Sequence, residues 1–186
     1  MSGNLGQAKV QQTATAASAE QQQYLTFKLG KEMFAVGILN IREIIEFGGL
    51  TTVPMMPRFV RGVINLRGAV VPVIDLAARF GREPAPVTRR TCTVIVELEA
   101  DSGEQRQQLG LMVDSVSEVL EIPPDKVEPA PAFGAKVRAD FIKGMGKVNE
   151  KFVIILNINS VLAVEEMANL TAAVQPAEGG LPTPAK

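Results

Sequence analysis

The chain of 186 residues contains no histidine and no tryptophan, and only one cysteine and one tyrosine. Without histidine, Ser-His and Cys-His nucleophile pairs, histidine metal ligands and phosphohistidine are all excluded. The single cysteine, Cys92, excludes an internal disulfide and a zinc site built from this chain's thiolates, and it agrees with a reducing compartment. Most routes to catalysis at neutral pH are therefore closed, and we expect neither a metal nor a cofactor.

Strong positive charge and long apolar runs are also missing. The net charge is −1 at pH 7 and the isoelectric point is about 5.6, whereas binding to a phosphate backbone requires a basic surface. No stretch approaches the roughly 18 consecutive apolar residues of a membrane span, and the N-terminus does not resemble a signal peptide. We therefore expect a cytoplasmic protein that neither binds nucleic acid nor inserts into a membrane.

Composition separates a folded region from two tails. Residues 1–23 are rich in Gln, Ala, Ser and Thr, and residues 171–186 are rich in Pro, Ala and Gly. Such segments bury too little apolar surface to fold, so both tails are expected to be disordered. The folded region is expected at residues 24–170.

Two stretches of the folded region follow one plan. The matched residues, each pair separated by 82 positions, are Phe59 and Phe141, Gly62 and Gly144, and Asp75 and Asn157. An upstream stretch, 34–46, recurs at 109–121 with a shift of 75 positions. A self-repeat identifies the structural unit of a chain.

Each copy of the repeat contains about five short apolar strands. Strands this short are expected to curl into a barrel, because closure removes exposed strand edges. The sequence therefore predicts a mainly β fold of two tandem five-stranded barrels. The first is expected at about 24–82 and the second at about 88–160, followed by a closing helix to about residue 170.

Local patterns refine this picture. Residues 38–47 fit both a helical face and a strand, and a single helical turn followed by a strand satisfies both patterns. Asp75 is placed to cap a short helix at 76–80, and Asn157 stands at the matching position. Asn can replace Asp as a helix cap but not as a general base, so capping is the favoured interpretation.

The hairpin residues also carry a family resemblance. Residues 62–68 (GVINLRG) followed by 71–76 (VPVIDL) resemble the signature of the CheW family of bacterial chemotaxis coupling proteins. Further segments that fit the family are 38–44, 113–116 and 129–131. The resemblance covers nearly all of the expected folded region and leaves out the tails.

The resemblance implies a fold and a function. The family fold is two five-stranded barrels of SH3-like topology around a shared core, and family members are adaptors rather than enzymes. They bind the cytoplasmic tip of a chemoreceptor helical hairpin and the regulatory domain of the chemotaxis histidine kinase. The chain is thus expected to be recruited to membrane-associated receptor clusters.

The resemblance also assigns roles to individual residues. It places Ile38, Ile41, Glu43 and Arg67 at the receptor contact, and Gly62, Arg67 and Val119 at the surface that binds or couples to the kinase. Arg67 is expected at the tip of a tight turn, where its guanidinium group suits bidentate pairing with a partner's carboxylates or carbonyls.

Several of these positions have a structural interpretation as well. Ile38 and Ile41 are either core residues or an exposed docking patch, and the sequence does not choose between the two. The residue type of Val119 favours the core. Gly62 and Gly144 indicate a constraint on the backbone first, although a side chain at Gly62 would also obstruct a partner. Cys92 is expected to be a small buried hydrophobic residue.

Two other functions are compatible with parts of the sequence. The first is an adaptor of a non-flagellar chemosensory pathway. The second is a small-barrel nucleic-acid-binding module, which the net charge and an aromatic content of 5% disfavour. The segment Asp101-Ser102-Gly103 resembles an aspartic-protease motif, but the repeat supplies no second copy, and a hairpin turn is favoured.

Overall fold

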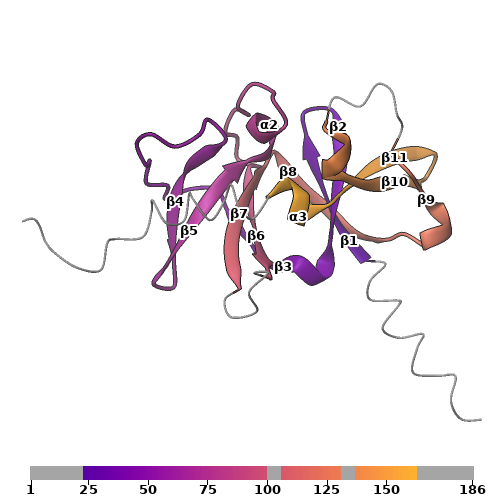
Figure 1. The fold of residues 1–186 in the computed structure, drawn as a ribbon, viewed down its shortest axis with the longest axis horizontal. Coiled ribbons are helices and arrows are strands. Elements are labelled where there is room, and N and C mark those ends of the chain that lie inside the picture. The colour runs from indigo at the N-terminus through magenta and orange to yellow at the C-terminus, as the bar shows by residue number, and fades with distance from the viewer. Residues whose placement is uncertain (1–22, 100–105, 131–136, 163–186) are drawn as a thin grey trace, which may run out of the picture.

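The computed structural model describes residues 23–99, 106–130 and 137–162, which are mainly β (Figure 1). The strands are β1 (Gln23–Leu29), β2 (Glu32–Gly37), β3 (Ile41–Glu46), β4 (Val60–Leu66), β5 (Ala69–Asp75), β6 (Cys92–Leu98), β7 (Gln107–Val113), β8 (Ser115–Glu121), β9 (Val127–Glu128), β10 (Ile142–Val148) and β11 (Lys151–Leu156). The helical elements are the single turns η1 (Ile38–Asn40), η2 (Pro124–Lys126) and η3 (Ala139–Phe141) and the short helices α2 (Leu76–Arg79) and α3 (Ile158–Val161). In the described ranges, no helix has both the length and the apolar character of a membrane span.

The strands form two sheets that lie side by side (Figure 1). The six-stranded sheet has the order β8-β1-β2-β11-β10-β9, and the five-stranded sheet has the order β3-β6-β7-β5-β4. Each sheet contains one parallel pair, β2 with β11 and β5 with β7 respectively. The expected mainly β fold, built from two packed β units with short helices, is confirmed.

The sheets do not divide the chain at residues 82–88, where the boundary between the barrels was expected. The hairpin β1–β2 of the first repeat pairs with β8 and β11 of the second repeat. The hairpin β6–β7 of the second repeat pairs with β3 and β5 of the first. The two repeats follow each other in the sequence, but the N-terminal hairpin of each repeat belongs to the sheet that contains the C-terminal hairpin of the other repeat.

This exchange follows from the connections between strands. The turn η1 has three residues and carries the chain from β2 in the six-stranded sheet to β3 in the five-stranded sheet. A single residue, Asp114, makes the matching passage from β7 to β8. The Asp114 carboxylate accepts a hydrogen bond from the backbone N–H of Gly30 at 2.6 Å, which ties this passage to the turn between β1 and β2.

The largest apolar cluster joins the two sheets. It contains Phe27 and Phe34 from the six-stranded sheet, Leu109 and Leu111 from the five-stranded sheet, and residues of both short helices. Phenylalanine rings that are far apart in the sequence contact one another in this cluster. The ring centroids are 5.5 Å apart for Phe34 and Phe80 and 6.0 Å apart for Phe80 and Phe141. Burying this much apolar surface in one shared cluster makes the two sheets a single folding unit.

The repeated glycines mark places where a short segment approaches the hairpin. Thr51 forms two backbone hydrogen bonds with Val63, of 2.8 and 2.9 Å. A Cβ atom at Gly62, whose φ is +151°, would lie 2.4 Å from the Thr51 carbonyl oxygen. At Gly144 a Cβ would lie 2.6 Å from Cγ1 of Val127 in β9, which occupies the corresponding place. The structure thus supports the backbone interpretation of both glycines.

Both predicted caps are present. The backbone N–H of Ala78 donates to Oδ1 of Asp75 at 3.2 Å, and that of Ser160 donates to Oδ1 of Asn157 at 3.4 Å. The predicted helical turn followed by a strand at 38–47 is also confirmed, as η1 and β3. Of the closing helix expected to about residue 170, residues 158–161 are helical, and 163–170 lie outside the described residues.

Met55 has a strained backbone on an exposed loop. Its φ is 60°, a left-handed conformation that costs a non-glycine residue about 1–2 kcal/mol, and its side chain is fully exposed. Because Asn tolerates this conformation better, we expect Met55→Asn to raise the free energy of unfolding by about 0.5–1 kcal/mol in urea titrations. The control is Val87→Asn, which changes another exposed apolar residue without a positive φ and should give no gain; an equal gain in both variants would contradict the strain argument.

Candidate functional site

Two of the predicted receptor-contact residues, Glu43 and Arg67, contact each other. Nη1 of Arg67 donates to Oε1 of Glu43 at 2.8 Å, and Nη2 donates to Oε2 at 3.0 Å. Glu43 lies on β3 and Arg67 in the β4–β5 turn, so the pair connects the two edge strands of the five-stranded sheet. The sequence predicted both residues as contacts of a partner and did not predict that they pair with each other.

The turn geometry places Arg67 over β3. Arg67 and Gly68 both have positive φ, 52° and 87°, as a two-residue turn between twisted strands requires. The backbone N–H of Gly68 donates to Oδ1 of Asn65 at 2.9 Å, which holds the turn. Arg67 has a side-chain exposure of 77%, and an ion pair this open contributes at most about 1 kcal/mol to stability. Its main effect is to orient two charged groups on the surface.

Ile38 and Ile41 have different surroundings in the structure. Ile41 is half-buried and packs against the shared apolar cluster. Ile38 is also half-buried but lines a surface groove. Leu39, which also lines the groove, is 64% exposed, and Ile44 on β3 is 43% exposed. Neither residue was predicted as a site residue, because their exposure depends on the position of η1 and on β3 being an edge strand, which the sequence pattern does not show.

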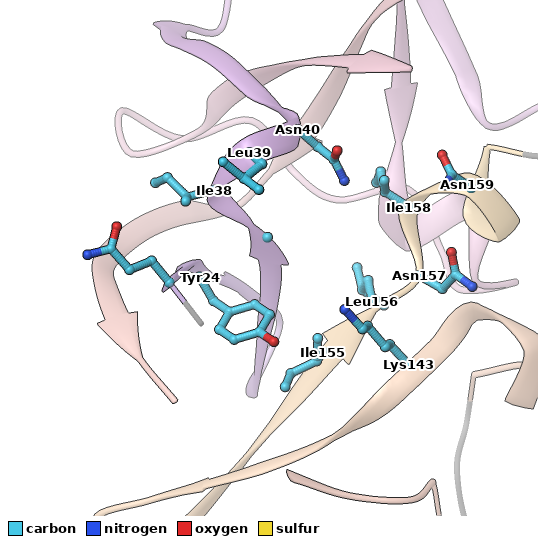
Figure 2. Close-up of a pocket in the computed structure, with 12 residues that line it drawn as sticks. Tyr24, Ile38, Leu39, Asn40, Lys143, Ile155, Leu156, Asn157, Ile158 and Asn159 are labelled. Carbon is cyan, nitrogen blue, oxygen red and sulfur yellow. The ribbon is translucent and has the colours of Figure 1, made fainter. Parts of the chain in front are cut away.

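The groove lies where η1 meets the start of α3, and it has a volume of about 450 Å³ (Figure 2). Four strands of the six-stranded sheet contribute to its lining, and the apolar residues among them are Tyr24 on β1 and Ile155 and Leu156 on β11. Figure 2 shows Tyr24 and Lys143 on either side of Ile155, with Ile38, Leu39 and Asn40 along the opposite wall. The remaining lining residues are Gln23, Gly37, Asn157, Ile158 and Asn159.

Tyr24, the single tyrosine of the chain, forms part of this wall. It is only 7% exposed, and burial raises the pKa of its phenol above the usual value of 10.0. The ring therefore remains neutral at physiological pH and gives the groove an apolar surface with one polar atom.

Val119 is 48% exposed on β8, so the expectation that it belongs to the core is wrong. The reason is its place on an edge strand, because β8 pairs only with β1. Ile44, at the matching position of the other repeat, is exposed on β3, an edge strand of the five-stranded sheet. Each sheet thus presents one exposed apolar residue on an edge strand, where partners commonly dock.

The local cluster of arginines does not form a free basic patch. Arg58 pairs with Glu83 at 2.7 Å, Arg61 lies 3.8 Å from the buried Asp75, and Arg67 pairs with Glu43. Each cation therefore has its own carboxylate. This arrangement gives no support to a surface for binding nucleic acid.

The other predicted features lie outside the groove. Cys92 is half-buried rather than buried, and its thiol donates to the carbonyl of Arg90 at 3.2 Å. Asp101-Ser102-Gly103 lies outside the described residues. Among residues 23–99, 106–130 and 137–162, no three His, Cys, Asp or Glu side chains come together in a group suited to a metal ion.

Comparisons with known proteins agree with this geometry. The CheW-like domain family matches residues 23–166. The chemotaxis protein CheW of Klebsiella aerogenes is 32% identical over 147 residues, covering 79% of this chain and 85% of that protein. Protein FrzA of Myxococcus xanthus is 28% identical over 152 residues, covering 80% and 91% respectively. The crystal structure of the scaffolding protein TtCheW from Thermoanaerobacter tengcongensis matches with a TM-score of 0.68 and 31% identity, covering 76% of this chain and 87% of that one.

The fold is a β scaffold of two sheets, with a groove on its surface and an exposed apolar residue on one edge strand of each sheet. Together with the family match, these features establish that the chain belongs to the CheW family of chemotaxis scaffolding proteins. Proteins of this family are adaptors and not enzymes, as the sequence analysis expected.

Proposed function

We propose that this protein links chemoreceptors to the regulatory domain of a histidine kinase in the cytoplasm, at receptor clusters. The observation that carries the proposal is the groove at the junction of the two repeats, which is lined by the exposed side chain of Leu39, the half-buried side chain of Ile38 and apolar residues of β1 and β11. A groove with an apolar wall is a common docking site for an amphipathic helix. The cytoplasmic tip of a chemoreceptor, a helical hairpin, supplies such a helix.

The receptor surface extends from the groove to the ion pair. Ile38 lies in the groove, Leu39 is exposed beside it, and β3 continues directly to Glu43. Glu43 and Arg67 hold each other's charged groups in one orientation, so a partner meets a preorganised pair rather than two mobile side chains.

The kinase surface lies on β8. Val119 is exposed there, and its cross-strand neighbour on β1 is Leu25. The residue next to Leu25 is Tyr24, which lines the groove. One strand therefore contacts both proposed docking surfaces, which gives receptor occupancy a short physical path to the kinase surface.

The pathway is part of the proposal and not of the family assignment. We propose that the protein acts in chemotaxis. An adaptor of a different chemosensory pathway is the alternative, and a relative named FrzA is among the similar proteins. Pull-downs from the protein's own cells, with identification of the receptor and kinase that it retains, decide between chemotaxis and a different chemosensory pathway.

The receptor surface is tested by co-sedimentation with receptor-containing membranes. We expect Glu43→Lys and Arg67→Ala each to weaken receptor binding about tenfold, equivalent to about 1.4 kcal/mol. Each should change the free energy of unfolding by less than about 1 kcal/mol, because the pair is exposed.

The matched control is Val119→Glu, which should keep receptor binding and weaken binding to the kinase regulatory domain. Unchanged receptor binding by both the Glu43 and the Arg67 variants would show that the receptor surface lies elsewhere. Failure of the unmodified protein to bind either partner would refute the proposed function itself.

A further inference from the structure

The groove holds a charge, that of Lys143, which has no ion-pair partner in the described part of the chain. Among the described residues that line it, Lys143 is the only one with a charged side chain. Lys143 is exposed on β10 and forms no ion pair with any side chain in the described ranges. Figure 2 shows it beside Leu156, directed toward the other labelled side chains. A groove that combines apolar side chains and neutral amides with one cation that has no ion-pair partner favours an occupant that carries a carboxylate.

The internal repeat supplies a comparison for this position. Lys143 corresponds to Arg61, and Asn157 corresponds to Asp75, both at the interval of 82 positions. Arg61 lies 3.8 Å from a carboxylate oxygen of Asp75. In the second repeat the carboxylate is replaced by the neutral amide of Asn157, although both residues cap their helices in the same way. The difference removes the counter-ion from Lys143 without loss of the cap.

We propose that Lys143 determines the specificity of the groove by pairing with a carboxylate on the docked helix. The occupant is therefore an amphipathic helix of the receptor tip with an acidic residue beside its apolar face. This inference rests on the proposed function, because it names the chemistry of the same groove. The amides of Asn40, Asn157 and Asn159 line the groove as well and offer neutral hydrogen bonds around the ion pair.

The test measures the affinity of a soluble cytoplasmic fragment of a chemoreceptor from the same organism, at about 50 mM and about 300 mM salt. We expect Lys143→Gln to weaken binding about fivefold to tenfold at low salt and to flatten its salt dependence. Asn157→Asp should act in the same direction, because it supplies Lys143 with an internal counter-ion and keeps the cap.

Two variants control for net charge and for the cap. Lys147→Gln removes a cation from the same strand at a position outside the groove. Asp75→Asn makes the converse exchange at the matching cap of the first repeat. Both should bind the fragment as the unmodified protein does, with the same salt dependence.

The outcomes separate this inference from the proposed function. If Lys143→Gln and Asn157→Asp bind like the controls while Ile38→Asp loses binding, the groove holds the helix but Lys143 has no role, and the inference is overturned. If Ile38→Asp also binds normally, the helix does not use the groove, and both the inference and the proposed receptor surface are overturned. Selective, salt-dependent loss in the two groove variants supports the inference.

Discussion

Replacing Gly62 with alanine is expected to lower the free energy of unfolding by about 3 kcal/mol, within the range for overpacked and strained sites. The added Cβ would lie 2.4 Å from the carbonyl oxygen of Thr51 and 3.0 Å from its carbonyl carbon. Both are backbone atoms, so no side chain can rotate to make room. The backbone at Gly62, with φ +151°, is also one that L-residues rarely adopt.

Equilibrium urea denaturation measures this loss, and two other glycines calibrate it. Gly144→Ala should cost less, because its closest neighbour is Cγ1 of Val127, a side-chain atom that can shift. Gly37→Ala should have little effect, since a Cβ there would contact nothing within 4 Å. A loss below about 1 kcal/mol for Gly62→Ala would contradict the inference that the Thr51 carbonyl leaves no room for a side chain at this position. The predicted kinase-coupling role of Gly62 remains a prediction, and its test must correct for this loss of stability.

Cutting the chain between the repeats, in segment 84–88, is expected to leave two fragments that do not fold alone. The first fragment holds the hairpin β1–β2 of the six-stranded sheet and only β3, β4 and β5 of the five-stranded sheet. The second holds the hairpin β6–β7 and β8–β11. Neither fragment can complete a sheet, and each exposes its part of the shared core to water. The expected loss is therefore the whole cooperative transition.

Mixing the fragments should restore the fold. Amide chemical-shift dispersion and circular dichroism, recorded for each fragment and for the equimolar mixture, measure the effect. The expected result is native-like dispersion only in the mixture, with a thermal transition that depends on concentration. Native dispersion of either fragment by itself would show that a repeat can pair with its own hairpin, and would contradict the exchange of hairpins.

Local sequence patterns predicted a large part of the fold. The strands, the turn at Arg67 and Gly68 and the caps at Asp75 and Asn157 all depend on interactions between residues close in sequence, and the structure shows each of them. The repeat predicted that glycine is required at positions 62 and 144 for the same reason. In the structure that reason is the close approach of a neighbouring segment at both Gly62 and Gly144. Features that depend on neighbouring residues can be predicted from short sequence patterns.

Long-range pairing was not predictable from the same patterns. Both hairpins are apolar and carry the same repeat, so nothing in the sequence distinguishes pairing within a repeat from pairing between repeats. The contact between Glu43 and Arg67 and the exposure of Val119 both depend on which strands form the sheet edges. The groove combines residues from both repeats, and the charge of Lys143 could be assigned to it only after the fold placed that residue there.

The most direct test of the central claim, that this protein acts by coupling two partners through its surfaces, is the autophosphorylation rate of the kinase. The rate is measured with receptor membranes and kinase in the presence and absence of this protein. We expect the protein to make the rate depend on receptor ligand, and we expect Arg67→Ala and Val119→Glu each to remove this dependence while remaining folded. A ligand-dependent rate in both variants, or none with the unmodified protein, would contradict it.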